Sequence, residues 1–243
     1  MGIAGADYGD MLPILRRRLA DLPNLQIVLL EADNISLIQD VFRRRDYYSL
    51  YAWGLQREDL PLGTWERIQQ AVLEFPWVAP FAYSRRLTPR AWAWRADPGD
   101  WLDYPGLGFV ASQAQVVPAN GGAVRIREHD REVSSESIAR NRAAFVELIR
   151  LLKARGIRVV LITLPHHEGY ACNASPRWRE IFSDLLDAGR AALGDQFLWW
   201  NMDGLPALDD RDFHDGHHLN ARGAAQLSKW IKARLVENGM WPN

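Results

Sequence analysis

The sequence has little cysteine and no long apolar run. Cys172 is the only cysteine among 243 residues, so no disulfide can form within the chain. The longest strongly apolar runs, such as 159–164, have the length of a strand rather than the ~20 residues of a membrane-spanning helix. No secretory signal is visible. The net charge of −1 gives no electrostatic reason to expect binding to nucleic acid or to an anionic membrane.

Helix-then-strand units organise both ends of the chain, and a composition of 48% hydrophobic residues is enough for one large core. The predicted strands are 25–31, 157–164 and 196–201. The predicted helices are one capped by Asp10 with Pro13 in its first turn, one from Ser134 or Ser135 to Gly156, one over 178–193, and one capped by Asn220. Unalternating apolar strands are typical of a parallel sheet covered on both faces, and such sheets carry their sites beyond the carboxyl ends of the strands. We therefore expect a single α/β domain over 1–243.

The middle of the chain, 42–133, is different because it is rich in aromatic residues, proline and glycine and has little periodicity. We interpret it as an insertion or lid subdomain. Its six tryptophans would suit stacking on sugar rings, and they would equally suit the packing of an irregular subdomain or a docked partner. Gly121 and Gly122, between 114–117 and 123–126, predict a hairpin connection.

Asp215 and His218 are the most informative pair in the sequence, because they lie in one tight turn just before a helix capped by Asn220. A hydroxyl nucleophile needs an imidazole to take its proton, and the imidazole needs a carboxylate to fix its tautomer. The same turn also carries His214 and His217. Those four residues could instead be a metal site or a solvated turn, but crowding in one turn argues against a good tetrahedral set, and we expect no metal and no other cofactor.

The run Asp215-x-x-His218-Leu-Asn220, followed by x-x-Gly-Ala, resembles the C-terminal signature of the SGNH/GDSL hydrolase superfamily. The strand 157–164 and its following loop 165–170 resemble the branch tied to bacterial envelope and exopolysaccharide acylation. The resemblance implies a three-layer α/β/α, flavodoxin-like fold in which Asp215 and His218 complete a Ser-His-Asp triad. His166, His167 and Tyr170 would then lie in a substrate loop.

The chain departs from that family at the nucleophile block, because no Gly-Asp-Ser or Gly-x-Ser motif follows a first strand. Residues 3–9 resemble the second block of the family, which makes the Gly5 backbone N–H an oxyanion candidate and implies that the nucleophile strand precedes this chain. Asn34 lies one position from the Asn of the third block and is a second oxyanion candidate. An Asn that only caps a loop after a strand is the alternative.

Two functions follow as expectations. The first is a carbohydrate esterase or O-acyltransferase that acts by acyl transfer on a glycan or another acylated small molecule. The second is a non-catalytic domain of the same fold that binds a glycan or a partner protein of an envelope assembly, since fold alone does not fix function. The resemblance implies a periplasmic or envelope-associated location. The two functions differ in whether a hydroxyl or thiol lies within hydrogen-bond reach of His218.

Overall fold

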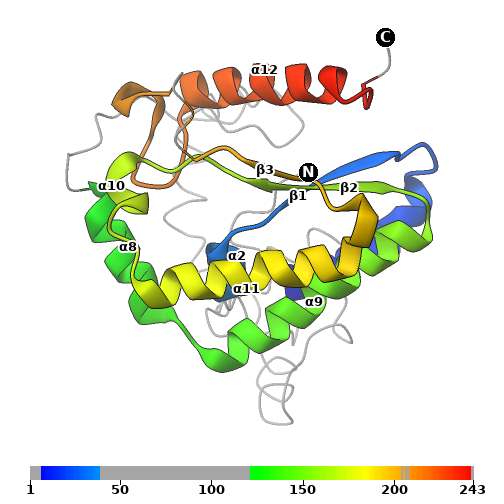
Figure 1. Cartoon of the computed structure of the whole chain (residues 1–243), viewed down its shortest axis with the longest axis horizontal. Helices are drawn as coiled ribbons and strands as arrows, with labels where there is room; N and C mark the ends of the chain where they lie inside the picture. The colour runs from blue at the N-terminus through cyan, green and yellow to red at the C-terminus, as the bar shows by residue number, and fades with distance from the viewer. Residues whose placement is uncertain (1–6, 39–120, 204, 206–207, 242–243) are drawn as a thin grey trace, which may run out of the picture. The chain divides into compact units, whose positions relative to one another are not determined.

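The described residues form an α/β structure built on a parallel sheet. The structure is a computed structural model, and it describes residues 7–38, 121–203, 205 and 208–241 (Figure 1). Three strands, β1 (Ile27–Glu31), β2 (Arg158–Thr163) and β3 (Trp199–Asn201), pair in parallel in the order β1-β2-β3. This confirms the predicted α/β class and the parallel sheet. Each strand lies within its predicted range, and β3 begins three residues later than expected.

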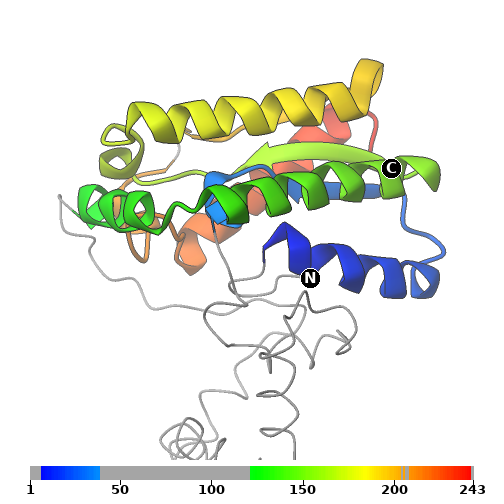
Figure 2. The same cartoon turned by 90° about the horizontal axis from the view of Figure 1, so that it is seen from below.

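Helices lie on both faces of the sheet. Helix α12 (Ala221–Glu237) covers one face, and α9 (Ser135–Ala154) and α11 (Pro176–Leu193) run below the other (Figure 1). Seen after a quarter turn, α11, α9 and α1 (Tyr8–Arg18) lie side by side in front of the sheet, with α12 behind it (Figure 2). The remaining elements are α8 (Gly121–Glu132), the short helices α2 (Asn34–Ile38) and α10 (Glu168–Ala171), and the 3-10 turns η1 (Leu19–Asp21), η3 (Gly194–Gln196) and η4 (Asp210–Asp212).

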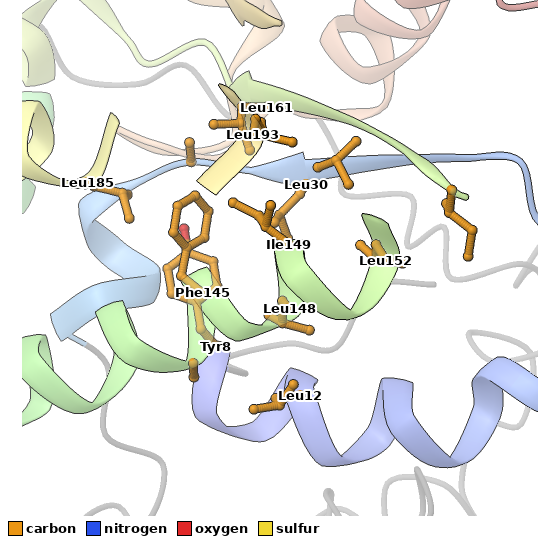
Figure 3. Packing of buried hydrophobic residues seen from close by; sticks show 14 of the residues in the cluster. Tyr8, Leu12, Leu30, Phe145, Leu148, Ile149, Leu152, Leu161, Leu185 and Leu193 are labelled. Carbon is orange, nitrogen blue, oxygen red and sulfur yellow. The ribbon is translucent and has the colours of Figure 1, made fainter. Parts of the chain in front are cut away.

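The central strand β2 is buried on both faces, which explains its unbroken apolar sequence. Val159 and Leu161 point to the larger core, and Val160 and Ile162 point to the smaller core under α12. The larger core joins α1, α9 and α11 to the sheet (Figure 3), and its labelled members are Tyr8, Leu12, Leu30, Phe145, Leu148, Ile149, Leu152, Leu161, Leu185 and Leu193. The sheet packs against a hydrophobic core on each face, and this packing holds the carboxyl ends of the strands in place.

The helix boundaries follow from local capping chemistry. Ser134 caps α9 by accepting a hydrogen bond from the backbone N–H of Ser137, and Gly156 adopts a positive φ of 72° after that helix ends. Asn220 caps α12 through bonds from Arg222 N and Gly223 N. These caps confirm the predicted starts of both helices.

The predicted cap of the first helix is wrong. Asp7, not Asp10, is the N-cap of α1. Its carboxylate accepts a hydrogen bond from Asp10 N, and the carboxylate of Asp10, the third helical residue, accepts one from Asp7 N, which makes a capping box. Pro13 consequently lies in the second turn rather than the first. Asp7 and Asp10 lie three residues apart, and aspartate is a favoured N-cap at either position.

The predicted hairpin at Gly121 and Gly122 is also wrong, because both begin α8. Ile126 on this helix is fully buried beside Tyr170 and Trp178, so tertiary packing overrides the local turn signal. The rest of the predicted insertion, up to residue 120, lies outside the described residues. All described residues belong to the larger of the two compact units of the chain, Ile3–Leu55 with Ala111–Asn243. No helix in the described ranges combines the length and apolarity needed to cross a bilayer.

We predict that Asp10→Asn stabilises the protein at alkaline pH. Burial, together with the charge of Asp7, raises the pKa of Asp10 to about 8. The positive charge of Arg140, which lies 3.1 Å from Asp7, acts in the opposite direction but does not outweigh them. A carboxyl whose folded pKa is raised costs stability progressively as pH rises from about 4 to about 8. The neutral amide avoids this cost, so urea unfolding at pH 8.5 is expected to show a gain of at least about 1 kcal/mol.

The gain in unfolding free energy is expected to shrink as the pH is lowered towards 4, where Asp10 of the folded wild-type protein is neutral like the amide that replaces it. Asp21→Asn is the matched control, because Asp21 is exposed just after the same helix and pairs with Arg18. Equal effects of the two substitutions at pH 8.5 would contradict the prediction.

Candidate functional site

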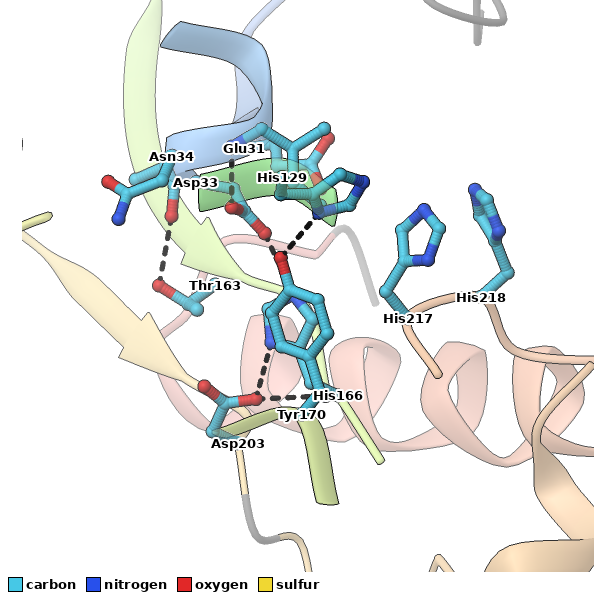
Figure 4. Close-up of polar contacts among 12 residues, drawn as sticks. Glu31, Asp33, Asn34, His129, Thr163, His166, Tyr170, Asp203, His217 and His218 are labelled. Carbon is cyan, nitrogen blue, oxygen red and sulfur yellow. Dashed lines mark hydrogen bonds and ion pairs between the residues drawn. The ribbon is translucent and has the colours of Figure 1, made fainter. Parts of the chain in front are cut away.

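The loops that follow the three strands meet at the carboxyl edge of the sheet. Asp33 lies two residues after β1, His166 three after β2, and Asp203 two after β3. The backbone ties the first two loops together, since Ala32 N donates to Ile162 O and Thr163 Oγ1 donates to Ala32 O. Figure 4 shows these side chains converging from separate elements, with His217 and His218 to one side. This edge is where a parallel sheet of this kind is expected to hold its site.

A buried imidazole joins the three strand ends. His166 Nε2 lies 2.9 Å from Asp33 Oδ2, and its Nδ1 and backbone N–H each lie 2.9 Å from Asp203 Oδ1. The side chains of His166 and Asp33 are 8% and 6% exposed. We call these three residues the clasp.

The clasp holds a cation between two anions. Burial alone would lower the pKa of His166, but the carboxylates of Asp33 and Asp203 outweigh it and raise that pKa to about 10. Burial would likewise raise the pKa of Asp33, and the His166 charge lowers it instead. His166 is therefore an imidazolium at neutral pH. Both of its nitrogens are occupied as donors, so it cannot act as a general base.

The predicted pair Asp215 and His218 is brought together by a short turn between η4 and α12. His218 Nδ1 lies 2.8 Å from Asp215 Oδ2, and the backbone N–H of His218 donates to Asp215 Oδ1 at 2.8 Å. An antiparallel bridge between Phe213 and Leu219 closes the turn. A Cβ on Gly216 would lie 2.7 Å from the Cα of Gly122, so the turn packs closely on the start of α8. We call Asp215 and His218 the dyad.

The dyad has the orientation that a general base requires. Burial alone would raise the pKa of Asp215, but the contacts with His217 and His218 outweigh it and hold the pKa well below its usual range. Asp215 is thus an anion that holds Nδ1 of His218 and leaves Nε2 outward. The His218 side chain is 59% exposed. No hydroxyl or thiol within the described ranges forms a hydrogen bond with it, and so the nucleophile is not identified among those residues.

His217 separates the dyad from the clasp. Its ring stacks near that of Tyr170, with centroids 6.1 Å apart, and Tyr170 stacks on His166 at 4.7 Å. The His217 side chain is only 6% exposed, and burial lowers its pKa. Its Nδ1 lies 3.1 Å from Asp215 Oδ1 as an ion pair, although the two atoms are not aligned for a hydrogen bond.

The other predicted site residues have protein partners. Asn34 Nδ2 donates to Trp178 O at 2.6 Å, which uses one of its two N–H groups. His167 caps α10 and its Nε2 lies 3.1 Å from Asp210 Oδ1, whereas the Tyr170 hydroxyl lies 2.8 Å from His129 Nδ1. Gly5 lies outside the described residues. The oxyanion roles of Asn34 and Gly5 and the substrate-loop role of 166–170 stay predictions.

A cavity of about 310 Å³ opens beside the clasp. Its polar lining includes Asp203 and Asn34, whose Oδ1 is buried and has no hydrogen-bond partner in the described part of the chain. Its aromatic lining is Tyr170, Trp178 and Phe182. A carboxylate and an amide beside aromatic faces suit a ligand with hydroxyl donors.

Sequence reasoning identified the dyad but missed the clasp. Asp203 carried no prediction, and His166 was placed only in a substrate loop. One signal was present, because an acidic residue follows both β1 and β3 at the same distance of two residues. Comparison of the chain with protein-family models, with curated proteins and with solved structures found no match.

Proposed function

We propose that this protein catalyses acyl transfer at an ester, as an SGNH-like carbohydrate esterase or O-acyltransferase. The observation that carries the proposal is the 2.8 Å contact between His218 Nδ1 and Asp215 Oδ2 in a turn beside the carboxyl edge of a parallel sheet. We also propose that the α/β structure has the three-layer, flavodoxin-like arrangement of the SGNH type. Helices on both faces of the sheet and the order β1-β2-β3 are compatible with it.

His218 would act through Nε2. This nitrogen takes the proton of the nucleophilic hydroxyl as its oxygen attacks the ester carbonyl, and the imidazolium then returns the proton to the leaving alcohol. Asp215 fixes the tautomer and stabilises the imidazolium. The acyl-enzyme passes its acyl group to water in an esterase, or to a glycan hydroxyl in a transferase. Gly5 and Asn34 are the proposed oxyanion donors.

The nucleophile in this proposal is a serine outside the described residues. The resemblance puts the nucleophile strand ahead of residues 3–9, whereas Ser49, Ser84 and Ser112 in the undescribed middle are serines that the chain itself offers, and the proposal adopts one of these three. A glycan substrate is proposed from the resemblance and from the cavity lined by Tyr170 and Trp178. An envelope-assembly protein is the proposed partner, from the resemblance alone.

A second candidate function is a non-catalytic domain that binds a glycan or a protein partner. It is favoured by one observation, which is that no hydroxyl or thiol of the described residues forms a hydrogen bond with His218, whose hydrogen-bond partner among them is Asp215. The two candidates differ in chemical reactivity and not in fold.

A fluorophosphonate probe distinguishes these candidates. We expect the purified chain to be labelled on one serine, located by peptide mass spectrometry, and labelling to be lost in His218→Ala because the hydroxyl is then no longer activated. His214→Ala is the matched control, since it removes an imidazole from the same turn but not from the dyad, and it is expected to retain labelling. Absence of labelling in a folded sample would refute acyl transfer by this chain and favour the binding domain.

A further inference from the structure

Three side chains of the dyad turn form a cluster with the composition of a metal site. One ligand atom from each of Asp215, His217 and His218 lies within 4.8 Å of the other two. His217 Nδ1 and His218 Nδ1 both face the Asp215 carboxylate, at 3.1 Å and 2.8 Å. Two imidazoles and one carboxylate are a common ligand set for Zn²⁺, and this set differs from the crowded set of four that the sequence made improbable, because His214 lies outside it.

His217 is the buried member of this cluster. Only 6% of its side chain is exposed, and its Nδ1 lies 3.1 Å from Asp215 Oδ1 as an ion pair but is not aligned for a hydrogen bond with any described residue. A buried polar atom normally has a partner. His217 Nδ1 and Asp215 Oδ1 lie close enough together to bind one cation. In a tetrahedral site with bonds of about 2.1 Å, two ligand atoms lie about 3.4 Å apart.

We propose that Asp215, His217 and His218 bind a divalent transition-metal ion of the Zn²⁺ class, and that the bound ion switches off the dyad. Three protein ligands leave a fourth position open, and the exposure of His218 places that position towards solvent. The regulatory half rests on the proposed function, whereas metal binding does not.

The switch follows from the two nitrogens of one imidazole. In the metal-free dyad, Nδ1 of His218 carries the proton held by Asp215, and Nε2 has the lone pair that accepts a proton from the nucleophile. A metal ion binds Nδ1 through a lone pair on Nδ1 itself, so the single proton of the neutral ring leaves Nδ1 and is carried on Nε2. Asp215 is occupied by the same ion. His218 then has no free lone pair and cannot be a general base.

Metal binding is tested by calorimetric titration of the full chain with ZnCl₂ and by the visible absorption of bound Co²⁺. We expect one equivalent to bind, with the intense Co²⁺ bands of a four-coordinate site. His217→Ala is expected to lower the affinity at least about tenfold, and His214→Ala to leave it nearly unchanged, because His214 lies outside the cluster. Absence of binding, or equal affinity of the wild-type protein and His217→Ala, would overturn the metal site.

The switch is tested by two readouts. Nitrogen-15 chemical shifts of His218 report the tautomer and need no activity, and Zn²⁺ is expected to move the proton to Nε2. Hydrolysis of an aryl acetate is expected to stop when Zn²⁺ is added and to return with EDTA, and the fractional inhibition is expected to be smaller in His217→Ala. An unchanged tautomer, or a rate that rises with Zn²⁺, would overturn the switch. Lack of hydrolysis by the metal-free protein would count against the proposed function alone.

Discussion

His166→Ala is expected to lower the free energy of unfolding by about 3–5 kcal/mol in urea titrations at pH 7. The loss arises because the substitution leaves Asp33 buried without its cation and removes the link to Asp203. His218→Ala is the control, since it also removes an imidazole that contacts a carboxylate. That imidazole is exposed, and we expect a cost of no more than about 1 kcal/mol. A loss below about 1 kcal/mol for His166→Ala would show that the clasp is not a major source of stability.

The same variant has a defined dependence on pH. The folded pKa of His166 is raised to about 10, above the ordinary value of 6.5. Its contribution to stability is therefore fully present below about pH 6.5 and is lost as pH rises through about 10. The unfolding free energies of the wild-type protein and His166→Ala should converge towards pH 10. A difference that stays constant from pH 6 to 10 would mean that His166 stabilises by packing and not by charge.

Asp215→Asn is expected to lower the rate of acyl transfer by about 10⁴-fold, the effect of removing the orienting carboxylate from a Ser-His-Asp triad. An amide can present its N–H to His218 Nδ1, which favours the tautomer with the proton on Nε2. The measurement is kcat for an aryl acetate, with metal removed beforehand. Asp210→Asn is the control, because Asp210 contacts His167 and lies outside the dyad.

The expected loss is in kcat, because the interaction of Asp215 with the imidazole strengthens as His218 gains a proton. The backbone N–H groups of 217 and 218 can still donate to the amide oxygen, so the turn is expected to remain folded. A fall of less than tenfold, in a variant with unchanged unfolding free energy, would remove Asp215 from the proposed mechanism.

Most of the α/β framework was predictable because its signals are local. Strand β2 is a run of apolar residues, and Ser134, Gly156 and Asn220 mark helix ends by chemistry that involves only their immediate neighbours. The hairpin prediction failed for the opposite reason. Two adjacent glycines are also a local signal, but the burial of Ile126 against Tyr170 and Trp178, which lie far away along the sequence, decides the structure there.

The candidate site divides in the same way. Asp215 and His218 are three residues apart and share one turn, so their spacing predicted the contact. The clasp depends on three strand ends, with Asp33 and His166 separated by 133 residues, and no spacing rule predicts such a contact. The burial of His217 Nδ1 was equally unpredictable from the sequence, because it depends on which side chains pack around the ring.

The clasp also acts as a cross-link. It joins segments separated by 133 and 37 residues, and the three joined strand ends restrict the chain much as a covalent bridge would. The only cysteine, Cys172, lies outside it and is exposed. The clasp consists of an imidazolium and two carboxylates, so it is equally stable under oxidising and reducing conditions. What opens it is a change in proton concentration, so the integrity of this sheet edge is coupled to pH and not to redox potential.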